Sequence, residues 1–300
     1  MQQLTIATIV YPSRSSETNA VLFAESVRSF GGALHQTPIW CFMPCHEEPL
    51  SSAARQKLDW LEVTIIPFEH SHEVPKFAFT GHVEAAALAE SRARHHSNLL
   101  AWLAPNTLVL QEPREFLLQK SKSLGYRPVH HKLLGLRFNE PLDAFWSLIY
   151  DYCGVSEDRI FPMRTQIEDI EIRPYFNAGL LILDPNLGIL RAWRNTFFRI
   201  YQESSFQPIY NQDSRYEIFM SQAVLSGVIL SNLAESQMQE LSMRYNYPLN
   251  LYAQDLTENR PNSLEECPTV RHEGFYLSPE WMKTIPAGEL LKQWIAERLL

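Results

Sequence analysis

The sequence predicts an α/β fold with a mostly parallel central sheet that is covered by helices on both faces. Two observations lead to this prediction. Short apolar runs alternate with amphipathic segments along most of the 300 residues, as they do in βαβ units. Several of these runs are apolar at consecutive positions, which is typical of strands buried on both sides. A chain of this length with 45% hydrophobic residues can also bury a large core.

The expected strands are short and end at turn residues. Apolar, largely β-branched residues predict a first strand at Leu4–Val10, which Tyr11-Pro12-Ser13 ends. Further strands are expected at Pro38–Met43, Glu62–Pro67, Leu99–Leu103 and Tyr175–Leu183, and Leu108–Leu110 continues an extended path. The strands at 4–10, 99–103 and 175–183 should be neighbours or near-neighbours in one sheet, because all three are apolar on both faces.

Helices are expected between these strands. After a polar loop at Ser13–Asn19, apolar residues at helical spacing predict a helix at Ala20–Phe30, which Gly31-Gly32 ends. Similar spacing predicts helical segments at Ser52–Leu58, Val83–His95, Phe138–Val155, Leu187–Ser204, Ile218–Leu230 (running into a short strand) and Ala287–Leu300. Since no repeat or linker interrupts the chain, we expect a single domain over residues 1–300, with 241–300 as a C-terminal extension packing on it.

The charge balance argues against some classes of partner. There are 26 basic and 34 acidic residues, and a net charge of −8 disfavours nucleic acid or an anionic membrane surface. No window approaches the ~18 consecutive apolar residues of a membrane-spanning helix. The amino terminus has no basic stretch before its short apolar run, so a cytoplasmic location is expected.

The remaining sequence patterns exclude several other activities. The four cysteines, Cys41, Cys45, Cys153 and Cys267, are too scattered for a disulfide framework and are expected to be free thiols. A zinc site at Cys41, Cys45 and His46 would lack its second pair of ligands. The absence of a Walker loop, of G-x-G-x-x-G after the first strand and of G-x-S-x-G disfavours ATPase, dinucleotide-binding and hydrolase functions.

Two polar steps mark the expected ligand site. The turn at 104–107, Ala-Pro-Asn-Thr, follows the strand Leu99–Leu103, and ligands of open α/β sheets sit outside the carboxyl ends of the strands. The strand at 175–183 contains Asn177-Ala178-Gly179, where small side chains allow a ligand to approach the backbone and the Asn amide can donate and accept hydrogen bonds. The alternative interpretation of this second step is an ordinary strand after a turn.

Four stretches, in this order along the chain, resemble motifs of GT-A glycosyltransferases, above all the glycogenin and lipopolysaccharide galactosyltransferase group. LLAWLAPNTLVLQEP is similar to the segment that carries Asp-x-Asp in that family, and FNAGLLILDP to its FNSG segment. EIFMSQAVLSGVI resembles its helix with Asp-Gln, and RYNYP followed by VRHEGFY resembles its Asn-containing strand and late His motif. The resemblance implies a GT-A-like, Rossmann-related fold and a nucleotide-diphosphate sugar as donor, with a UDP-sugar as the first candidate.

The resemblance also has departures that concern the metal. Aligning the turn places Ala104 and Asn106 where the family has its two Asp residues, so the Asp-x-Asp motif would be degenerate. In the family those carboxylates hold Mn²⁺ or Mg²⁺, and a hard cation prefers charged oxygen ligands. Ser221-Gln222 likewise keeps the amide of Asp-Gln and loses the carboxylate. We therefore expect a metal-independent or weakly metal-dependent transferase, with Mn²⁺ or Mg²⁺ as its only candidate cofactors and no metal ligand assigned.

The resemblance supplies the candidate site residues. Asn177 and Gln222 are the catalytic candidates, and His272, in the late motif, should lie within one side chain's reach of Asn106. The donor is expected to contact Tyr11, Arg14, Lys76, Asn106, Asn177, Ala178, Gly179, Gln222 and His272. The basic residues among them could hold phosphate without a cation. The alternative function is an inactive homologue that keeps the fold to bind a nucleotide or carbohydrate; the missing acidic residues favour it, whereas the retained amides and His favour the enzyme.

Overall fold

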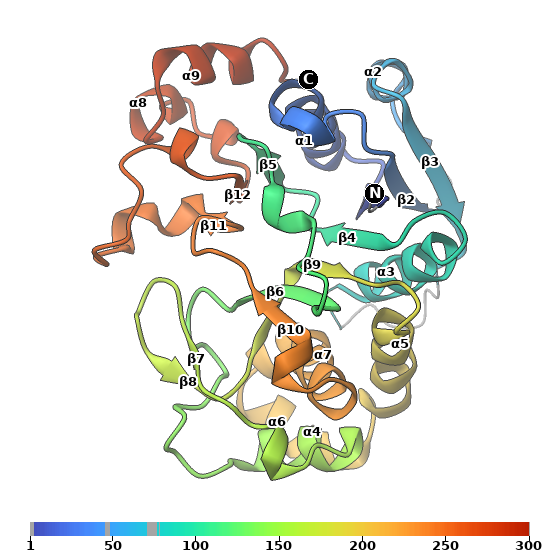
Figure 1. Cartoon of the computed structure of the whole chain (residues 1–300), viewed down its shortest axis with the longest axis vertical. Coiled ribbons are helices and arrows are strands. Elements are labelled where there is room, and N and C mark those ends of the chain that lie inside the picture. Colours follow the sequence, from blue (N-terminus) through green and yellow to red (C-terminus); the bar gives the residue numbers. More distant parts are fainter. Residues whose placement is uncertain (1–2, 46–48, 71–76, 78, 300) are drawn as a thin grey trace.

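A seven-stranded sheet forms the centre of the molecule, with strand order β10-β6-β9-β4-β1-β2-β3 (Figure 1). The structure, a computed structural model, describes residues 3–45, 49–70, 77 and 79–299. The strands of this sheet are β1 (Leu4–Ile9), β2 (Ile39–Pro44), β3 (Val63–Phe68), β4 (Leu99–Leu103), β6 (Leu124–Pro128), β9 (Phe176–Leu183) and β10 (Met238–Glu240). β9 runs antiparallel to β4 and β6, and the other pairings are parallel. The predicted mostly parallel sheet is confirmed, and β9, β4 and β1 are consecutive neighbours as expected.

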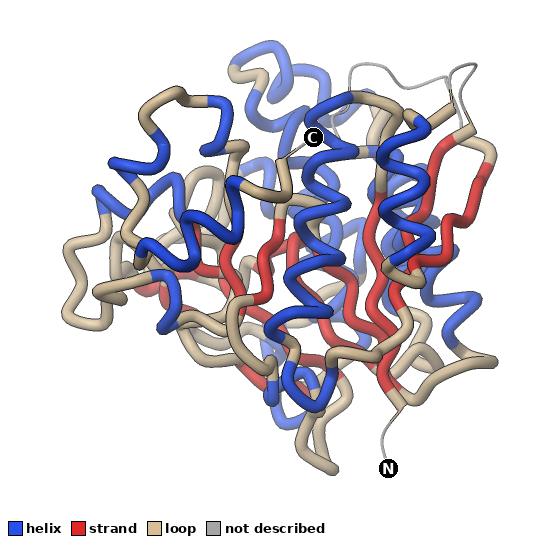
Figure 2. The backbone as a smooth tube through the Cα atoms, turned by 90° about the horizontal axis from the view of Figure 1, so that it is seen from above, coloured by secondary structure: helices blue, strands red, loops and turns tan. Residues whose placement is uncertain are grey.

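Helices cover both faces of this sheet, because successive side chains of a strand point to opposite sides. From β4, Leu100 and Trp102 pack on one face with residues of α3 (Thr80–Ala93), α5 (Ile189–Ile200) and α7 (Arg215–Asn232). Its other residues pack on the opposite face with α1 (Arg14–Phe30) and α2 (Ser52–Trp60). Figure 2 shows helices on either side of the strands when the molecule is seen from above. The α/β class predicted from the sequence is therefore confirmed.

A second, smaller sheet joins the C-terminal part of the chain to the turn after β4. Its order is β11-β12-β5, with β5 at Thr107–Val109, β11 at Tyr247–Pro248 and β12 at Thr269–Arg271. The antiparallel pairing of β12 with β5 sets Arg271 opposite Thr107. The extended path expected at 108–110 is thus a strand of this sheet, and it brings residue 271 beside the turn.

The C-terminal residues also pack directly on α1. The ring of Trp294, in α9 (Glu289–Ala296), lies 4.9 Å from that of Phe30, and Arg298 Nε lies 2.9 Å from a carboxylate oxygen of Glu25. Buried side chains of α9 form one apolar cluster with residues of β5, β11 and β12. These contacts support the single-domain interpretation, which we retain as a proposal.

The segment at 13–19, predicted to be a loop, is the beginning of α1. The backbone N–H of Tyr11 donates to Ser16 Oγ at 2.8 Å. The buried carboxylate of Glu17 accepts from Ser51 N at 2.7 Å and from Ser51 Oγ at 2.6 Å. Partners from another part of the chain therefore satisfy the polar residues of the first turns, and a local hydrophobic pattern does not contain that information. Arg14 is consequently a helix residue.

Three further segments differ from the prediction. The helix expected at 138–155 is α4 (Ala144–Cys153), capped by Asp143, whose Oδ1 accepts from Trp146 N at 2.8 Å. The apolar run to Leu230 is helical throughout α7, and the short strand after it is β10. β6 was not predicted at all. The remaining elements are β7 (Met163–Arg164), β8 (Glu171–Ile172), α6 (Gln207–Gln212) and α8 (Trp281–Thr284).

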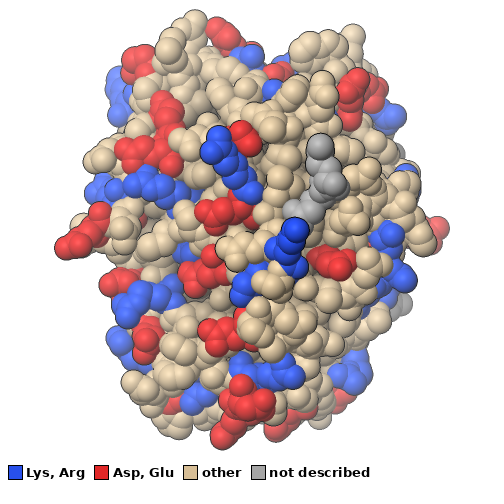
Figure 3. All heavy atoms as spheres, viewed as in Figure 1, with Lys and Arg blue, Asp and Glu red and all other residues tan. Residues whose placement is uncertain are grey.

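Three features of the surface and of the cysteines bear on the composition. Acidic and basic side chains are interspersed over the face in Figure 3, without a continuous basic patch. Within the part of the chain that the structure describes, no helix combines the length and the apolar character needed to cross a bilayer. All four cysteines are free; Cys41 is buried and Cys45 is exposed, whereas His46 lies outside the described residues.

Candidate functional site

A cavity of about 490 Å³ opens where β4 and β6 end and β9 begins. Because β9 is antiparallel, its first residues lie at the same edge of the sheet as the carboxyl ends of β4 and β6. One part of the lining is apolar and consists of Phe79, Trp102, Val129, Leu133, Trp193, Ile218 and Phe219. Another part is polar and includes Asn106, His130, Asn177, Gln222, Arg271 and Glu273. The cavity therefore lies where an open α/β sheet binds its ligand.

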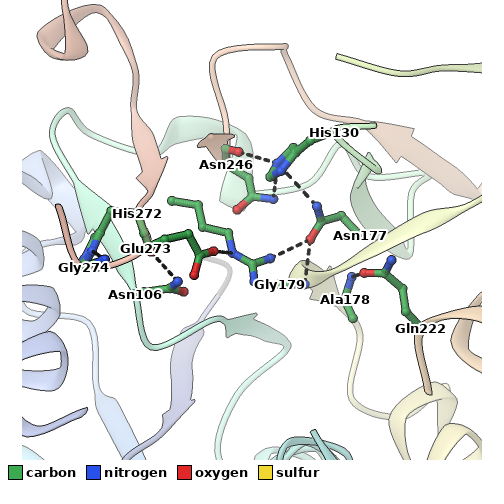
Figure 4. A network of polar contacts seen from close by, with 11 residues as sticks. Asn106, His130, Asn177, Ala178, Gly179, Gln222, Asn246, His272, Glu273 and Gly274 are labelled. Carbon is green, nitrogen blue, oxygen red and sulfur yellow. Dashed lines mark hydrogen bonds and ion pairs between the residues drawn. The ribbon is translucent and has the colours of Figure 1, made fainter. Parts of the chain in front are cut away.

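Asn177 and Gln222 converge on this cavity, as the sequence led us to expect (Figure 4). Asn177 is 4% exposed, and its Oδ1 accepts from the backbone N–H of Gly179 at 2.9 Å. Gln222, on α7, accepts through Oε1 from the backbone N–H of Ala178 at 3.1 Å. Both carbonyl oxygens thus hold the first residues of β9.

His130 joins this network from the end of β6. Its Nε2 lies 2.9 Å from Asn246 O, 3.2 Å from Asn246 Nδ2 and 3.4 Å from Asn177 Nδ2 (Figure 4). Burial lowers the pKa of His130 to about 3, and the nearby Arg271 adds to this effect. The ring is therefore neutral at physiological pH, and it orients the two amides without adding charge to the cavity.

Asn106 and His272 are adjacent, but only the backbone of His272, and not its ring, takes part in the contact. His272 N donates to Asn106 O at 2.9 Å, and Asn106 Nδ2 donates to His272 O. Side chains alternate in this segment, so Arg271 and Glu273 face the cavity while the His272 ring does not. That ring is completely buried, 5.3 Å from the ring of Phe275. The expected proximity is confirmed, whereas the expected contact of the His272 side chain with the donor has no support in this geometry.

Of the three donor-contact candidates from the N-terminal part of the chain, the structure describes Tyr11 and Arg14. The Tyr11 hydroxyl packs against Gly81, where an added Cβ would lie only 2.4 Å away, and burial raises the pKa of Tyr11 to about 12, with Glu84 adding to the rise. Arg14 is exposed on the first turn of α1. Neither belongs to the described residues that line the cavity. Lys76 lies outside the described residues.

Arg271, like His130, is a residue of this cavity that sequence reasoning missed. Its side chain is 23% exposed, and Nη1 lies 3.4 Å from Asn177 Oδ1. A Cβ added to Gly179 would lie 2.6 Å from that Nη1 and 3.4 Å from the Ala104 Cβ, so the guanidinium lies directly over the start of β9. Burial lowers the pKa of Arg271, and Glu273 opposes this effect. The sequence contains no local signal for this placement, because the direction of the Arg271 side chain depends on the pairing of β12 with β5.

The residues of this site do not fit a divalent cation. The side chain of Ala104 offers no ligand atom, and Asn106, whose Nδ2 donates to the His272 carbonyl, offers only a neutral amide oxygen. Glu273 is the one acidic residue among the described residues that line the cavity, and its carboxylate faces Arg271. Across those parts of the chain that are described, no cluster of three or more His, Cys, Asp or Glu side chains could hold a metal ion. The hard, charged oxygen ligands that Mn²⁺ or Mg²⁺ would need are therefore missing from this donor set.

The neutral His130 leads to a prediction about acid stability. A histidine whose pKa is lowered by folding contributes stability that is present above its unfolded pKa, near 6.5, and is lost as the pH falls toward about 3. We expect His130→Asn to lose roughly 1–2 kcal/mol less unfolding free energy than the wild type between pH 7.5 and pH 5. Urea titrations at both pH values measure this difference. Equal losses in the two proteins would show that His130 is not the group that titrates.

The central sheet with its single antiparallel strand β9, and the polar cavity at the carboxyl edge of that sheet, have the arrangement of a GT-A fold. The chain belongs to the Rhodobacterales glycosyltransferase family, whose domain model matches residues 7–231. That match includes the turn after β4, the start of β9 and Gln222, and it ends before Arg271. No curated protein sequence matches the chain.

Solved structures of glycosyltransferases resemble this fold at low sequence identity. The bifunctional glycosyltransferase WbbM is similar over 99% of this chain and 52% of its own, with a TM-score of 0.50 and 9% identity. An active-site mutant of LgtC is similar over 98% of this chain and 96% of its own, with a TM-score of 0.49 and 15% identity. Mouse xyloside xylosyltransferase 1 is similar over 89% of this chain and 96% of its own chain, with a TM-score of 0.45 and 11% identity.

Proposed function

We propose that this protein transfers a sugar from a nucleotide-diphosphate sugar, with a UDP-sugar as the first candidate, and that it binds this donor without a divalent metal ion. The observation that carries the proposal is the convergence of Asn177, Gln222 and Arg271 on one cavity at the carboxyl edge of the sheet. These side chains come from β9, α7 and β12, and their donors suit the oxygen atoms of a diphosphate and a sugar.

The reaction defines what the polar part of the cavity must do. Transfer breaks the bond between the anomeric carbon and a diphosphate oxygen, so negative charge gathers on the diphosphate as it leaves. Fixed donors and a positive charge beside that oxygen stabilise the transition state, and they act most strongly in a site that excludes water. Asn177 and Gln222 are neutral, and we assign them to binding and orientation rather than to proton transfer.

The apolar part of the cavity suits the rest of the substrates. Trp102 and Trp193 are nearly completely buried, and Trp193 is further held by Nε1, which donates to Ser221 O at 2.6 Å. Phe79, which is 44% exposed and also lines the cavity, can pack against the apolar face of a sugar or a base, while the amides satisfy its polar edge. This division into apolar and polar parts is typical of small-molecule sites, where a few polar groups set the orientation.

A donor screen tests the proposal. We expect one nucleotide sugar of a panel (UDP-glucose, UDP-galactose, GDP-mannose) to stabilise the protein equally well in chelator and in Mn²⁺. At a hundred times its dissociation constant it should add ~2.7 kcal/mol to the unfolding free energy. Gln222→Leu should weaken the effect, and the matched variant Gln212→Leu, at an exposed position of α6, should not.

The outcomes separate the two candidate functions. Binding accompanied by release of the nucleoside diphosphate supports the transferase. Binding without release would favour the inactive homologue, for which the specific observation is Ala104 at the position that the resemblance aligns with a carboxylate. Stabilisation by no nucleotide sugar under either condition would contradict the proposal.

A further inference from the structure

We propose that Arg271 is the cation that holds the diphosphate of the donor, in the place where a metal ion would otherwise act. The inference rests on the proposed function and deepens it, because it assigns the recognition of the charged group to one residue. The residue comes from β12, outside the segment that the family model matches. It reaches the site because β12 pairs with β5, which directly follows the turn of Ala104 and Asn106.

The N–H donors of the Arg271 guanidinium are only weakly engaged by other residues. Nη1 is 3.4 Å from Asn177 Oδ1, and Nε is 3.5 Å from a carboxylate oxygen of Glu273. Charge-assisted hydrogen bonds are usually 2.7–2.9 Å long, so both contacts are weak. Nε is buried and has no hydrogen-bond partner among the described residues. A buried donor without a partner costs free energy, and an anionic oxygen placed beside it would remove that cost.

The charges around the cavity favour an anion at this point. Arg271 is the one Lys or Arg among the described residues that line it, and Glu273 is the one acidic residue. Glu273 is 54% exposed on its side chain, so its carboxylate can turn into solvent when an anion takes its place beside the guanidinium. A planar guanidinium can hold two phosphate oxygens at once, and it supplies its charge at every physiological pH.

The lack of a side chain at residue 179 creates the space in which this guanidinium lies. Gly179 does not have a positive φ, so alanine is compatible with its backbone. The added Cβ would nevertheless lie 2.6 Å from Arg271 Nη1, which is the free end of a flexible side chain and can move. Gly179→Ala therefore displaces the guanidinium while it keeps the charge. Because the same Cβ would lie 3.0 Å from Asn177 Oδ1, uridine affinity is compared with UDP affinity in this variant as well.

Isothermal titration calorimetry in chelator, with UDP, uridine and inorganic pyrophosphate, tests the assignment. Arg271→Gln should weaken UDP and pyrophosphate at least about tenfold and leave uridine unchanged, since a hydrogen bond to a charged group is lost. Arg271→Lys should bind UDP with intermediate affinity, because it restores the positive charge without the planar guanidinium that can hold two phosphate oxygens at once. Gly179→Ala should weaken UDP in the same direction as Arg271→Gln.

Glu273→Gln provides the opposite test and does not depend on the folding of the Arg271 variants. Removing its charge frees the guanidinium and lowers the repulsion of the diphosphate, so UDP should bind more tightly, by about threefold to tenfold. Arg114→Gln is the matched control for Arg271→Gln. It too removes one positive charge, but the Arg114 side chain is 81% exposed and does not line the cavity. It should leave UDP affinity unchanged.

The possible failures are distinguishable. If the wild type binds UDP and Arg271→Gln, folded by circular dichroism, binds it equally well, the assignment of Arg271 is overturned and the proposed function stands. If UDP affinity falls together with uridine affinity, Arg271 acts on the shape of the cavity and the assignment is again overturned. If the wild type binds neither pyrophosphate nor the nucleoside diphosphate of any donor in the panel, the proposed function fails and the assignment fails with it.

Discussion

Nucleotide binding should become dependent on Mn²⁺ when two carboxylates are placed in the turn after β4. In the double variant Ala104→Asp, Asn106→Asp, we expect UDP affinity in chelator to fall at least about tenfold, because two negative charges would lie near the diphosphate. One of them would also lie beside Arg271, whose guanidinium shares the space over Gly179 with the Ala104 methyl group. Adding Mn²⁺ should restore the affinity, because the ion bridges the new carboxylates and the phosphate oxygens.

The variant needs two controls. Ala104→Asn has nearly the same shape as Ala104→Asp without the charge, so its UDP affinity should not change with Mn²⁺. Ala104→Asp alone keeps the amide of Asn106, whose Nδ2 donates to the His272 carbonyl, and it shows how much of the loss comes from breaking that bond. Calorimetry on each protein, in chelator and in Mn²⁺, decides the matter. Strong Mn²⁺ dependence in the wild type would contradict our alignment of this turn.

The largest loss of stability is expected at Glu90, a fully buried carboxylate of α3 that holds the start of α5. It accepts from the backbone N–H of Leu190 at 3.2 Å and of Arg191 at 2.9 Å, and Arg191 Nε lies 3.2 Å from the same carboxylate. Glu90→Ala should cost roughly 3–5 kcal/mol, since it leaves two N–H groups and a guanidinium without their partner. Chemical denaturation measures this cost.

Glu90→Ala should also change the cavity, because Glu90 holds the start of α5 and α5 carries a residue of the cavity lining. Trp193, one turn along that helix, lines the cavity and holds the Ser221 carbonyl on α7, next to Gln222. We therefore expect Glu90→Ala to weaken donor binding as well as stability. Glu90→Gln keeps the shape of the side chain and one accepting oxygen, so it should lose less stability and less donor affinity than Glu90→Ala. Glu280→Ala removes an exposed partner of Lys283 and should cost under about 1 kcal/mol. Equal stability of Glu90→Ala and Glu280→Ala would refute the structural role of Glu90.

Local pattern was sufficient for much of the central sheet. The runs at 4–10, 99–103 and 175–183 are apolar at consecutive positions because the strands they form are covered on both faces, and they are neighbours. β6 escaped prediction because it carries a glycine, a proline and an arginine. The glycine and the arginine have tertiary reasons: a Cβ at Gly125 would lie 2.7 Å from Leu118, and Arg127, 1% exposed, pairs with Glu240 at 2.7 Å.

Some residues of the candidate site could also be predicted from local sequence, whereas the placement of others depends on the tertiary structure. Asn177 and Gln222 could be selected from the sequence because each lies in a stretch that resembles a family motif, and both line the cavity. His272 could be placed beside Asn106, but the direction of its ring could not be known, because that depends on how β12 pairs with β5. Arg14 was assigned to a loop because the partners of the first turn of α1 lie elsewhere in the chain.

By itself, the sequence determined the α/β class, the positions along the chain of most of its buried strands, the turn after β4 and the small residues Ala178-Gly179 near the start of β9, since all of these depend on local periodicity and residue size. Only the tertiary structure decided which charge enters the cavity. The pairing of β12 with β5 joins residues 107 and 271, far apart in the chain, and strand alternation then buries His272 and turns Arg271 over Gly179. The physical reason is that a side chain's direction depends on the pairing of its strand, and that pairing is a long-range property.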